Sequence, residues 1–290
     1  MSNSMNDNRE IRSKMAKETL EILKQGCYIN GAGEHIQIGN DVKGSVEHSM
    51  MYSPDMLSKI KQYALERIRQ TQDDALPPLE VTNESTLHAA ERLVVREGWE
   101  QTVCLNFASA KNPGGGFLGG SQAQEESLAR SSALYPCISQ MKEMYDYNKS
   151  IKTCLYSDYM IYSPKIPVFR EDRGKLLLHP YPVSMITAPA VNAGVVQQRE
   201  PHNVKNIEPV MLERVRFILA VAAFHNELSV ILGAYGCGVF RNDPSDIAKM
   251  FKQVLIDERF ASLFDKVVFA ILDNSADKRV FKTFTTILTD

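Results

Sequence analysis

The chain has 290 residues, of which 44% are hydrophobic and 23% charged, a composition typical of a globular protein with a sizeable core. Its 33 lysines and arginines nearly balance 35 aspartates and glutamates, for a net charge of −2. This balance excludes general binding to a nucleic-acid backbone, which requires a basic face. No segment approaches the roughly 18 consecutive apolar residues of a membrane-spanning helix, so we expect no membrane association.

Cysteine and histidine usage favours a reducing compartment and disfavours a metal site. The five cysteines are odd in number and form no CxxC pair, and the six histidines form no HxH or HExxH motif. The polar first fifteen residues lack the apolar core of a signal peptide. We therefore expect free thiols and a cytoplasmic location, with a nuclear location left open if the source is eukaryotic.

Residues 1–75 are predicted to form a mainly helical extension. A helix over 9–26 follows from apolar residues at near-helical spacing and a glycine at its end. Segment 27–53 carries four glycines and short alternating runs, which predict a hairpin or an irregular extended structure. A second helix is expected over 55–70, followed by a linker at 74–78 that contains two prolines.

Strands and helices alternate in the remainder, residues 76–290. The predicted strands are 79–82, 102–107, 158–162, 181–187, 228–233 and 266–272. The predicted helices are 84–97, 122–133, 138–146, 206–226, 244–257 and 277–287. Strands such as 102–107 are nearly continuous apolar runs, typical of parallel strands buried on both faces. The pattern predicts an α/β fold with a mixed, largely parallel central sheet.

A glycine-rich loop follows the strand at 102–107 and precedes a helix. Five of the seven residues from Gly114 to Gly120 are glycine, which allows backbone N–H groups to approach a ligand closely. Ser121 and Gln124 fit a capping box, so we expect the helix to start at Ser121, with two glutamates in its first turn. Acidic residues there also stabilise a helix through its dipole, but the preceding glycines favour a binding site.

The first loop also matches GxGxxG, the fingerprint of dinucleotide-binding folds. In that fingerprint the first glycine directly follows the strand, and an acidic residue lies about 20 positions after the motif. Here six residues separate the strand from Gly114, and the acidic residues lie in the next helix. We therefore disfavour a nicotinamide cofactor and hydride transfer.

A second loop, residues 236–240, follows the strand at 228–233 and precedes a helix opened by Arg241–Pro244. Two glycines at the end of a strand are a weak signal alone. Two such loops, each after a buried strand, are what a sheet crevice that binds a diphosphate would use. Phe240 would either contact the ligand or pack in the core.

The two loops together resemble a known family. Three glycines, seven residues and then Gln-Glu-Glu, here ending at Glu126, resemble the signature of poly(ADP-ribose) glycohydrolases. The second loop is similar to the other phosphate loop of the macrodomain fold, and the helical extension is similar to that of the microbial type. The resemblance covers nearly the whole chain and implies a three-layer α/β/α macrodomain.

The resemblance also implies roles for individual residues. Glu126 would be the catalytic acid/base, and Glu125 would hold ribose hydroxyls beside the scissile bond. The two loops would enclose the diphosphate, and Phe240 would press on the terminal ribose. The ligand-binding residues implied are Asn112, Gly114, Gly115, Gly116, Gln124, Gly236, Cys237, Gly238, Val239 and Phe240.

The helix restricts how the two glutamates can act. Adjacent residues on a helix point about 100° apart, so these carboxyls cannot form a facing glycosidase pair. The remaining arrangement is one carboxyl that takes part in the chemistry and one that binds the substrate. A single catalytic carboxyl can first donate and then accept a proton if burial raises its pKa toward neutral. Arg130, four residues after Glu126, would lower the pKa of Glu126 if paired with it. We expect Arg130 instead to face elsewhere or to pair with Glu143 or solvent.

The leading prediction is thus a glycosidase that cleaves the ribose–ribose O-glycosidic bonds of poly(ADP-ribose), without metal or other cofactor. We expect exo action with ADP-ribose as product, and poly(ADP-ribose) or ADP-ribosylated proteins as partners. Two alternatives remain open: a hydrolase of mono-ADP-ribose on protein or nucleobase, and a non-catalytic ADP-ribose-binding macrodomain.

Overall fold

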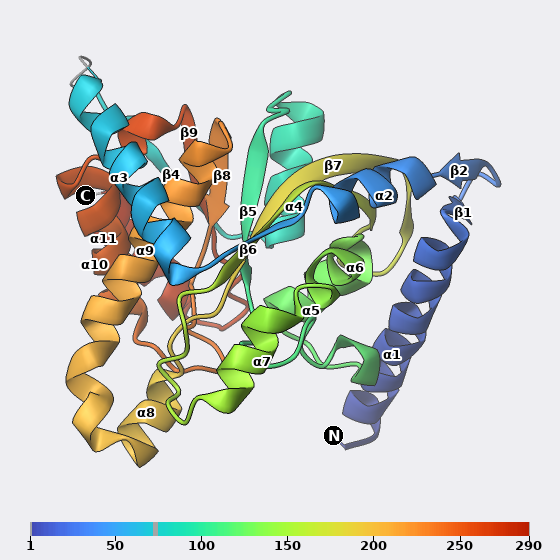
Figure 1. Ribbon diagram of the computed structural model, residues 1–290. Helices are drawn as coiled ribbons and strands as arrows, with labels where there is room; N and C mark the ends of the chain where they lie inside the picture. Colours follow the sequence, from blue (N-terminus) through green and yellow to red (C-terminus); the bar gives the residue numbers. More distant parts are fainter. Residues whose placement is uncertain (1, 72–74, 290) are drawn as a thin grey trace.

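The computed structural model describes residues 2–71 and 75–289, in which a central sheet lies between helices on both faces (Figure 1). Within these residues the sheet has seven strands in the order β3-β6-β7-β5-β8-β9-β4. Their bounds are β3 Met50–Tyr52, β4 Leu79–Thr82, β5 Thr102–Phe107, β6 Met160–Arg170, β7 Leu176–Ala188, β8 Ser229–Leu232 and β9 Lys266–Ala270. A separate hairpin consists of β1 Cys27–Ile29 and β2 His35–Gln37.

The sheet is mixed and largely parallel, as the sequence predicts. Strands β7, β5, β8, β9 and β4 are parallel neighbours in that order. Strand β6 runs antiparallel to β7, and β3 runs antiparallel to β6, so the antiparallel pairs lie at one edge.

The helices have the following bounds. The α-helices are α1 Ser2–Gln25, α2 Gly39–Glu47, α3 Pro54–Gln70, α4 Thr86–Glu91, α5 Gln124–Ser131, α6 Leu134–Ser139, α7 Lys142–Ser150, α8 Ala193–Arg199, α9 Ile207–Phe224, α10 Pro244–Lys252 and α11 Arg279–Thr289. Shorter turns of other helix types are η1 Arg92–Arg96, η2 Phe117–Gly119, η3 Pro201–Asn206, η4 Gln253–Asp257 and η5 Phe260–Leu263.

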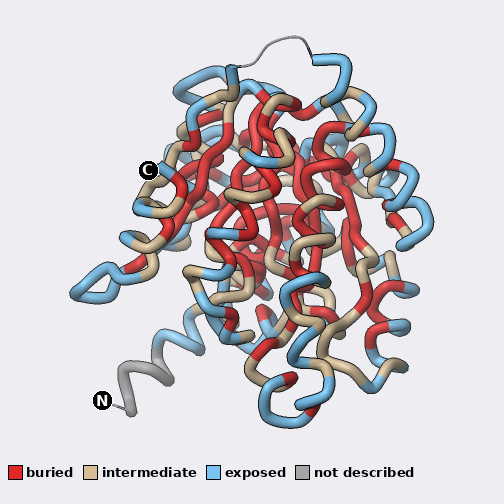
Figure 2. The backbone as a smooth tube through the Cα atoms, turned by 90° about the vertical axis from the view of Figure 1, so that its left-hand side faces the viewer, coloured by how far each residue is buried: buried red, intermediate tan, exposed pale blue. Residues whose placement is uncertain are grey.

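Successive residues of the central strands pack on opposite faces of the sheet. Val103 and Leu105 of β5 belong to a core that includes α3, α9 and α10. Cys104, between them, belongs to the core on the other face, with α4 and α6. Figure 2 shows the buried backbone running through the interior, with exposed segments around it. Alternation of side chains along a strand thus produces the three predicted layers.

Most predicted elements are confirmed, with shifted ends. The prediction of a hairpin or irregular extended structure is wrong for segment 39–47. This segment forms helix α2, although Gly39 and Gly44 are poor helix formers. Val42 and Ser45 are buried on its inner face, and α2 packs against β6, so tertiary contacts outweigh propensity here. The predicted strands 158–162 and 181–187 extend into the longer β6 and β7. Helix α6 lies mostly between the predicted helices 122–133 and 138–146, and α8 lies in a segment with no predicted helix.

The predicted extension contributes to the central layers. Its strand β3 forms the edge of the sheet, its helix α3 packs on α9, and α1 packs on η2 and α5. Asp74 of the predicted linker lies outside the described residues, and 75–78 have neither helix nor strand. The domain boundary at residue 75 stays a prediction. Among the described residues, none of the helices combines the length and apolar composition needed to cross a membrane.

Candidate active site

The two glycine-rich loops meet at the carboxyl ends of neighbouring parallel strands. Thr102 of β5 lies opposite Ser229 of β8, so both strands end at the same edge of the sheet. Open α/β sheets bind ligands in crevices at this edge. A cavity of about 610 Å³ lies there, lined by residues of both loops and of helix α5.

The structure brings most predicted site residues to the wall of this cavity. Those that line it are Asn112, Gly115, Gly116, Gln124, Glu125, Glu126, Gly236, Gly238, Val239 and Phe240. Gly114 and Cys237 lie outside its wall. Gly114 is buried beside the rings of Phe117 and Tyr135, and the Cys237 thiol donates to the carbonyl of Tyr235. Although it lies outside the wall, Gly114 also hydrogen-bonds to Glu125 through its backbone.

Helix α5 starts later than the predicted capping box. It begins at Gln124 with Ala123 as its N-cap, so the prediction of a start at Ser121 is wrong. The side chain of Gln124 bonds to strand β5 instead of capping the helix. Its Oε1 accepts from the N–H of Phe107 at 2.8 Å, and its Nε2 donates to the carbonyl of Leu105 at 2.7 Å. These bonds fix the start of α5 at the end of β5.

Glu125 is the buried carboxyl of the site, with 2% of its surface exposed. Its Oε2 accepts from the N–H of Ser109 at 2.7 Å, and its Oε1 accepts from Nδ2 of Asn106 at 3.3 Å. Burial raises the pKa of the Glu125 carboxyl to about 8, against the usual 4.5. Glu125 is therefore largely protonated at neutral pH and can both donate and accept hydrogen bonds.

Glu126 is half-buried and lines the same cavity as Glu125. Its Oε1 accepts from the N–H of Gly116 at 3.1 Å. Gly115 adopts φ +58°, and an ideal Cβ there would lie 2.5 Å from Oε1 of Glu126. The triple glycine thus allows the loop backbone to contact this carboxylate directly. The backbone of Gly114 hydrogen-bonds to Glu125, so the triple glycine contacts both carboxyls.

Arg130 holds the loop before the helix. It is buried and donates to the carbonyl of Ser121 at 2.7 Å and to Oε1 of Gln122 at 2.5 Å. Burial lowers the pKa of Arg130 to about 10, so it remains charged at neutral pH. The hydrogen-bond partners of Arg130 are therefore loop atoms of Ser121 and Gln122 and not Glu143, while the nearby Glu126 charge acts to raise the pKa of Arg130.

The second loop is closed by Asn242. The Asn242 side chain donates to the carbonyls of Val191 and Gly236, at 2.8 and 3.1 Å. Asp243 then caps α10 by accepting from the N–H of Ser245 at 2.8 Å. The ring of Phe240, on the cavity wall, lies 5.9 Å from the ring of Tyr156. The loop is thus tied at both ends and presents its tip to the cavity.

Sequence reasoning missed Asn106 and Ser109, which hold Glu125. Ser109 acts through its backbone N–H, which no side-chain pattern reveals. Asn106 carried a sequence signal, because it is an amide residue within a nearly continuous apolar run, and the structure shows it fully buried. Its side chain also donates to Oγ1 of Thr187 on the neighbouring strand β7 at 3.1 Å.

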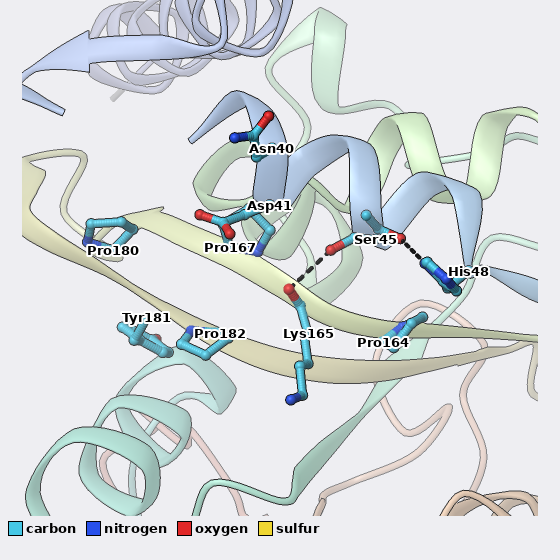
Figure 3. Close-up of a pocket in the computed structure, with 11 residues that line it drawn as sticks. Asn40, Asp41, Ser45, His48, Pro164, Lys165, Pro167, Pro180, Tyr181 and Pro182 are labelled. Atoms are coloured by element: carbon cyan, nitrogen blue, oxygen red, sulfur yellow. Dashed lines mark hydrogen bonds between the residues drawn. The ribbon is translucent and has the colours of Figure 1, made fainter. Parts of the chain in front are cut away.

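A second cavity, of about 530 Å³, lies between α2 and strands β6 and β7 (Figure 3). Four prolines form much of its wall, and Ser45 Oγ donates to the carbonyl of Lys165 across it at 2.9 Å. Its one carboxylate is Asp41, and none of the predicted site residues lines it. Within residues 2–71 and 75–289, no group of three His, Cys, Asp or Glu side chains is placed to bind a metal.

The comparisons with known proteins agree on one family. The model of the microbial-type PARG catalytic domain matches residues 16–171. A crystal structure of poly(ADP-ribose) glycohydrolase from Thermomonospora curvata is similar at 40% identity and a TM-score of 0.89, covering 96% of this chain and 99% of that chain. The same enzyme bound to the inhibitor ADP-HPD is similar at 39% identity and a TM-score of 0.87, with the same coverage.

A further similar structure is that of poly(ADP-ribose) glycohydrolase from Deinococcus radiodurans in complex with ADP-ribose. Its identity is 43% and its TM-score 0.79, and the match covers 85% of this chain and 96% of that chain. Comparison with curated proteins gives no match. These similarities confirm the fold class expected from the sequence.

Proposed function

The chain belongs to the microbial-type poly(ADP-ribose) glycohydrolases, and we propose that it cleaves the ribose–ribose bonds of poly(ADP-ribose) with the two glutamates of α5. The observation that carries the residue assignment is the difference in burial between the two carboxyls. Glu125 is buried and bound to Ser109 and Asn106, whereas Glu126 is half-buried and bound to Gly116. One cavity therefore holds a neutral binding carboxyl beside a second carboxyl that solvent and ligand can reach.

The cavity suits a terminal ADP-ribose unit. Its volume of about 610 Å³ lies in the range usual for small-molecule sites. In this proposal the diphosphate lies between the two glycine-rich loops, where backbone N–H groups can approach it. The terminal ribose lies against Phe240 and Asn112, with its hydroxyls on Glu125. Structures of two similar enzymes, one in complex with ADP-ribose and one bound to the inhibitor ADP-HPD, support ADP-ribose as the ligand class.

Glu126 performs the proton transfers in this mechanism. As the glycosidic bond breaks through an oxocarbenium-like transition state, Glu126 donates a proton to the leaving ribose oxygen. The resulting carboxylate then accepts a proton from the water that attacks the anomeric carbon. The N–H of Gly116 keeps the Glu126 carboxyl in place in both steps. Neutral Glu125 orients the ribose and adds no second negative charge beside Glu126.

Exo action, with ADP-ribose as product, is part of the proposal. The test incubates the protein with auto-modified poly(ADP-ribose) polymer and measures free ADP-ribose over time for wild type and Glu126→Gln. General acid–base catalysis typically contributes about 10²- to 10⁴-fold, so the variant should lose that much rate and still bind ADP-ribose. Release of oligomers before ADP-ribose would indicate endo action instead.

Two outcomes would contradict the assignment of roles. Equal rates for wild type and Glu126→Gln would exclude Glu126 as the acid/base. Binding of ADP-ribose without release from the polymer would indicate a reader or a hydrolase of a different linkage. Mono-ADP-ribosylated proteins and nucleobases would then be the next substrates to test.

A further inference from the structure

One face of helix α1 is bonded to the loop that follows the triple glycine. Figure 1 shows η2, which lies within this loop, beside α1, far from it in sequence. Three side chains of α1 donate to three successive loop carbonyls. The bonds are Arg9 Nε to Gly119 O at 2.8 Å, Arg12 Nε to Gly120 O at 2.8 Å, and Ser13 Oγ to Leu118 O at 2.7 Å.

The same face of α1 continues toward helix α5. Ala16 and Leu20 follow Arg12 at helical spacing and pack in a small cluster with Phe117 of η2 and Ala129 of α5. Thr19 donates from Oγ1 to the carbonyl of Arg130 in α5 at 2.6 Å, and this bond is buried. Helix α1 therefore contacts both the loop and the helix that carries the two glutamates.

The contact is close at Gly120. This glycine adopts φ +75°, and an ideal Cβ there would lie 2.0 Å from the carbonyl oxygen of Arg9. A side chain at this position would meet the backbone of α1. The loop and the helix are thus fitted backbone to backbone, and the three side-chain bonds are made around this point.

The bonded loop is the one that holds Glu126. The carbonyl of Gly116 accepts from the N–H groups of Gly119 and Ser121, at 3.0 and 3.2 Å, so the loop is a closed turn. The N–H of the same Gly116 donates to Glu126. A displacement at 118–120 is therefore transmitted to the peptide that positions the Glu126 carboxylate. A segment so rich in glycine has many alternative conformations when it is not held.

We propose that α1 is a positioning element of the active site, in which Arg9, Arg12 and Ser13 hold the loop so that Gly116 keeps Glu126 in place for proton transfer. The proposal rests on the acid/base role proposed for Glu126. It gives a function to the first helix of the extension, which carries no catalytic group of its own.

The test compares two double variants of α1 in the full chain. R9M/R12M removes both arginine donors and keeps their apolar stems, whereas K14M/K17M removes the same charge from exposed positions of the helix. We expect R9M/R12M to lower kcat on the polymer about tenfold, because small displacements of a catalytic group are costly. The dissociation constant for ADP-ribose should change less than about threefold, since α1 acts on the carboxylate and not on the ligand. K14M/K17M should leave both values unchanged.

A rescue variant and a single substitution complete the test. R9K/R12K retains a donor at each position and should recover most of the lost kcat. If R9M/R12M does not fold, as judged by circular dichroism, Ser13→Ala decides, with an expected loss in kcat of about threefold from one hydrogen bond. An unchanged kcat in the folded arginine variant, or in Ser13→Ala when that variant decides, overturns the proposal. An equal loss in K14M/K17M, or a fall in ADP-ribose affinity as large as the fall in kcat, also overturns it.

The Glu126→Gln variant separates the two proposals. Full activity in Glu126→Gln would remove the acid/base role on which the positioning role depends. Loss of activity in Glu126→Gln together with full activity in R9M/R12M would leave the proposed function intact and reject the role of α1 alone.

Discussion

Gly115 and Glu126 are in a contact that leaves no room for a side chain between them. An ideal Cβ on Gly115 would lie 2.5 Å from Oε1 of Glu126 and 3.4 Å from Oε2 of Glu125. The position of the Glu126 carboxylate in the cavity thus depends on a residue eleven positions earlier in the chain having no side chain.

Gly115→Ala should therefore inactivate the enzyme. Its methyl group would displace the Glu126 carboxylate, and a displacement of about 1 Å at a catalytic group can lower the rate about a hundredfold. The measurement is kcat for release of ADP-ribose from the polymer.

Gly98→Ala is the matched control for this substitution. Gly98 adopts a similar positive φ, +77°, but an added Cβ there would meet no atom within 4 Å. It reproduces the backbone strain without the steric conflict. If both variants lost activity equally, strain and not contact with Glu126 would explain the loss.

Glu125→Gln should flatten the dependence of stability on pH. The folded protein holds the Glu125 proton with a pKa of about 8, against 4.5 in the unfolded chain. Between these values the folded state binds more protons than the unfolded state, so the free energy of unfolding falls as pH rises. The stabilisation is complete below pH 4.5 and is lost as pH rises through about 8.

Urea unfolding across this pH window would test the prediction. Wild type and the exposed-site control Glu100→Gln should lose stability with rising pH, and Glu125→Gln should lose distinctly less. Parallel curves for all three proteins would mean that Glu125 does not hold its proton. Activity of Glu125→Gln should fall, since both carboxyl oxygens of Glu125 accept hydrogen bonds, from Ser109 and Asn106, and the amide nitrogen of glutamine cannot accept either of them.

Phe240→Ala should weaken binding of ADP-ribose. Phe240 lies on the cavity wall, supported by Tyr156, and is proposed to press on the terminal ribose. Loss of this aromatic contact should raise the dissociation constant about tenfold. Calorimetric titration with ADP-ribose measures it.

Val239→Ala is the control beside it. Val239 also lines the cavity, but 78% of its surface is exposed, so its truncation should change the dissociation constant less than about twofold. A larger effect at Val239 than at Phe240 would show that the ligand contacts the loop tip and not the aromatic ring.

The elements that carry the site were readable from local patterns. The apolar run of 102–107 forms β5, and the following glycines and Gln-Glu-Glu place both glutamates in the first turn of α5. A strand buried on both faces needs a continuous apolar run, and a close approach of backbone to a ligand needs glycine. These requirements act on neighbouring residues, so they leave a trace in a single sequence.

Other features depend on contacts between distant segments. Segment 39–47 is helical because Val42 and Ser45 are buried against the rest of the protein, despite two glycines. Helix α5 starts at Gln124 because that side chain bonds to Leu105 and Phe107. Local propensity predicted otherwise in both cases, since it does not include partners supplied by the fold.

The sequence by itself determined the α/β fold class and the two loops, because hydrophobic periodicity and glycine spacing are local properties. It indicated the two glutamates through the resemblance to a family signature. The tertiary structure decided which glutamate is buried and protonated, and that α1 binds the loop beside the other. Burial and electrostatic environment depend on every segment that packs around a group, and the partners of Leu118, Gly119 and Gly120 lie more than a hundred residues earlier in the chain.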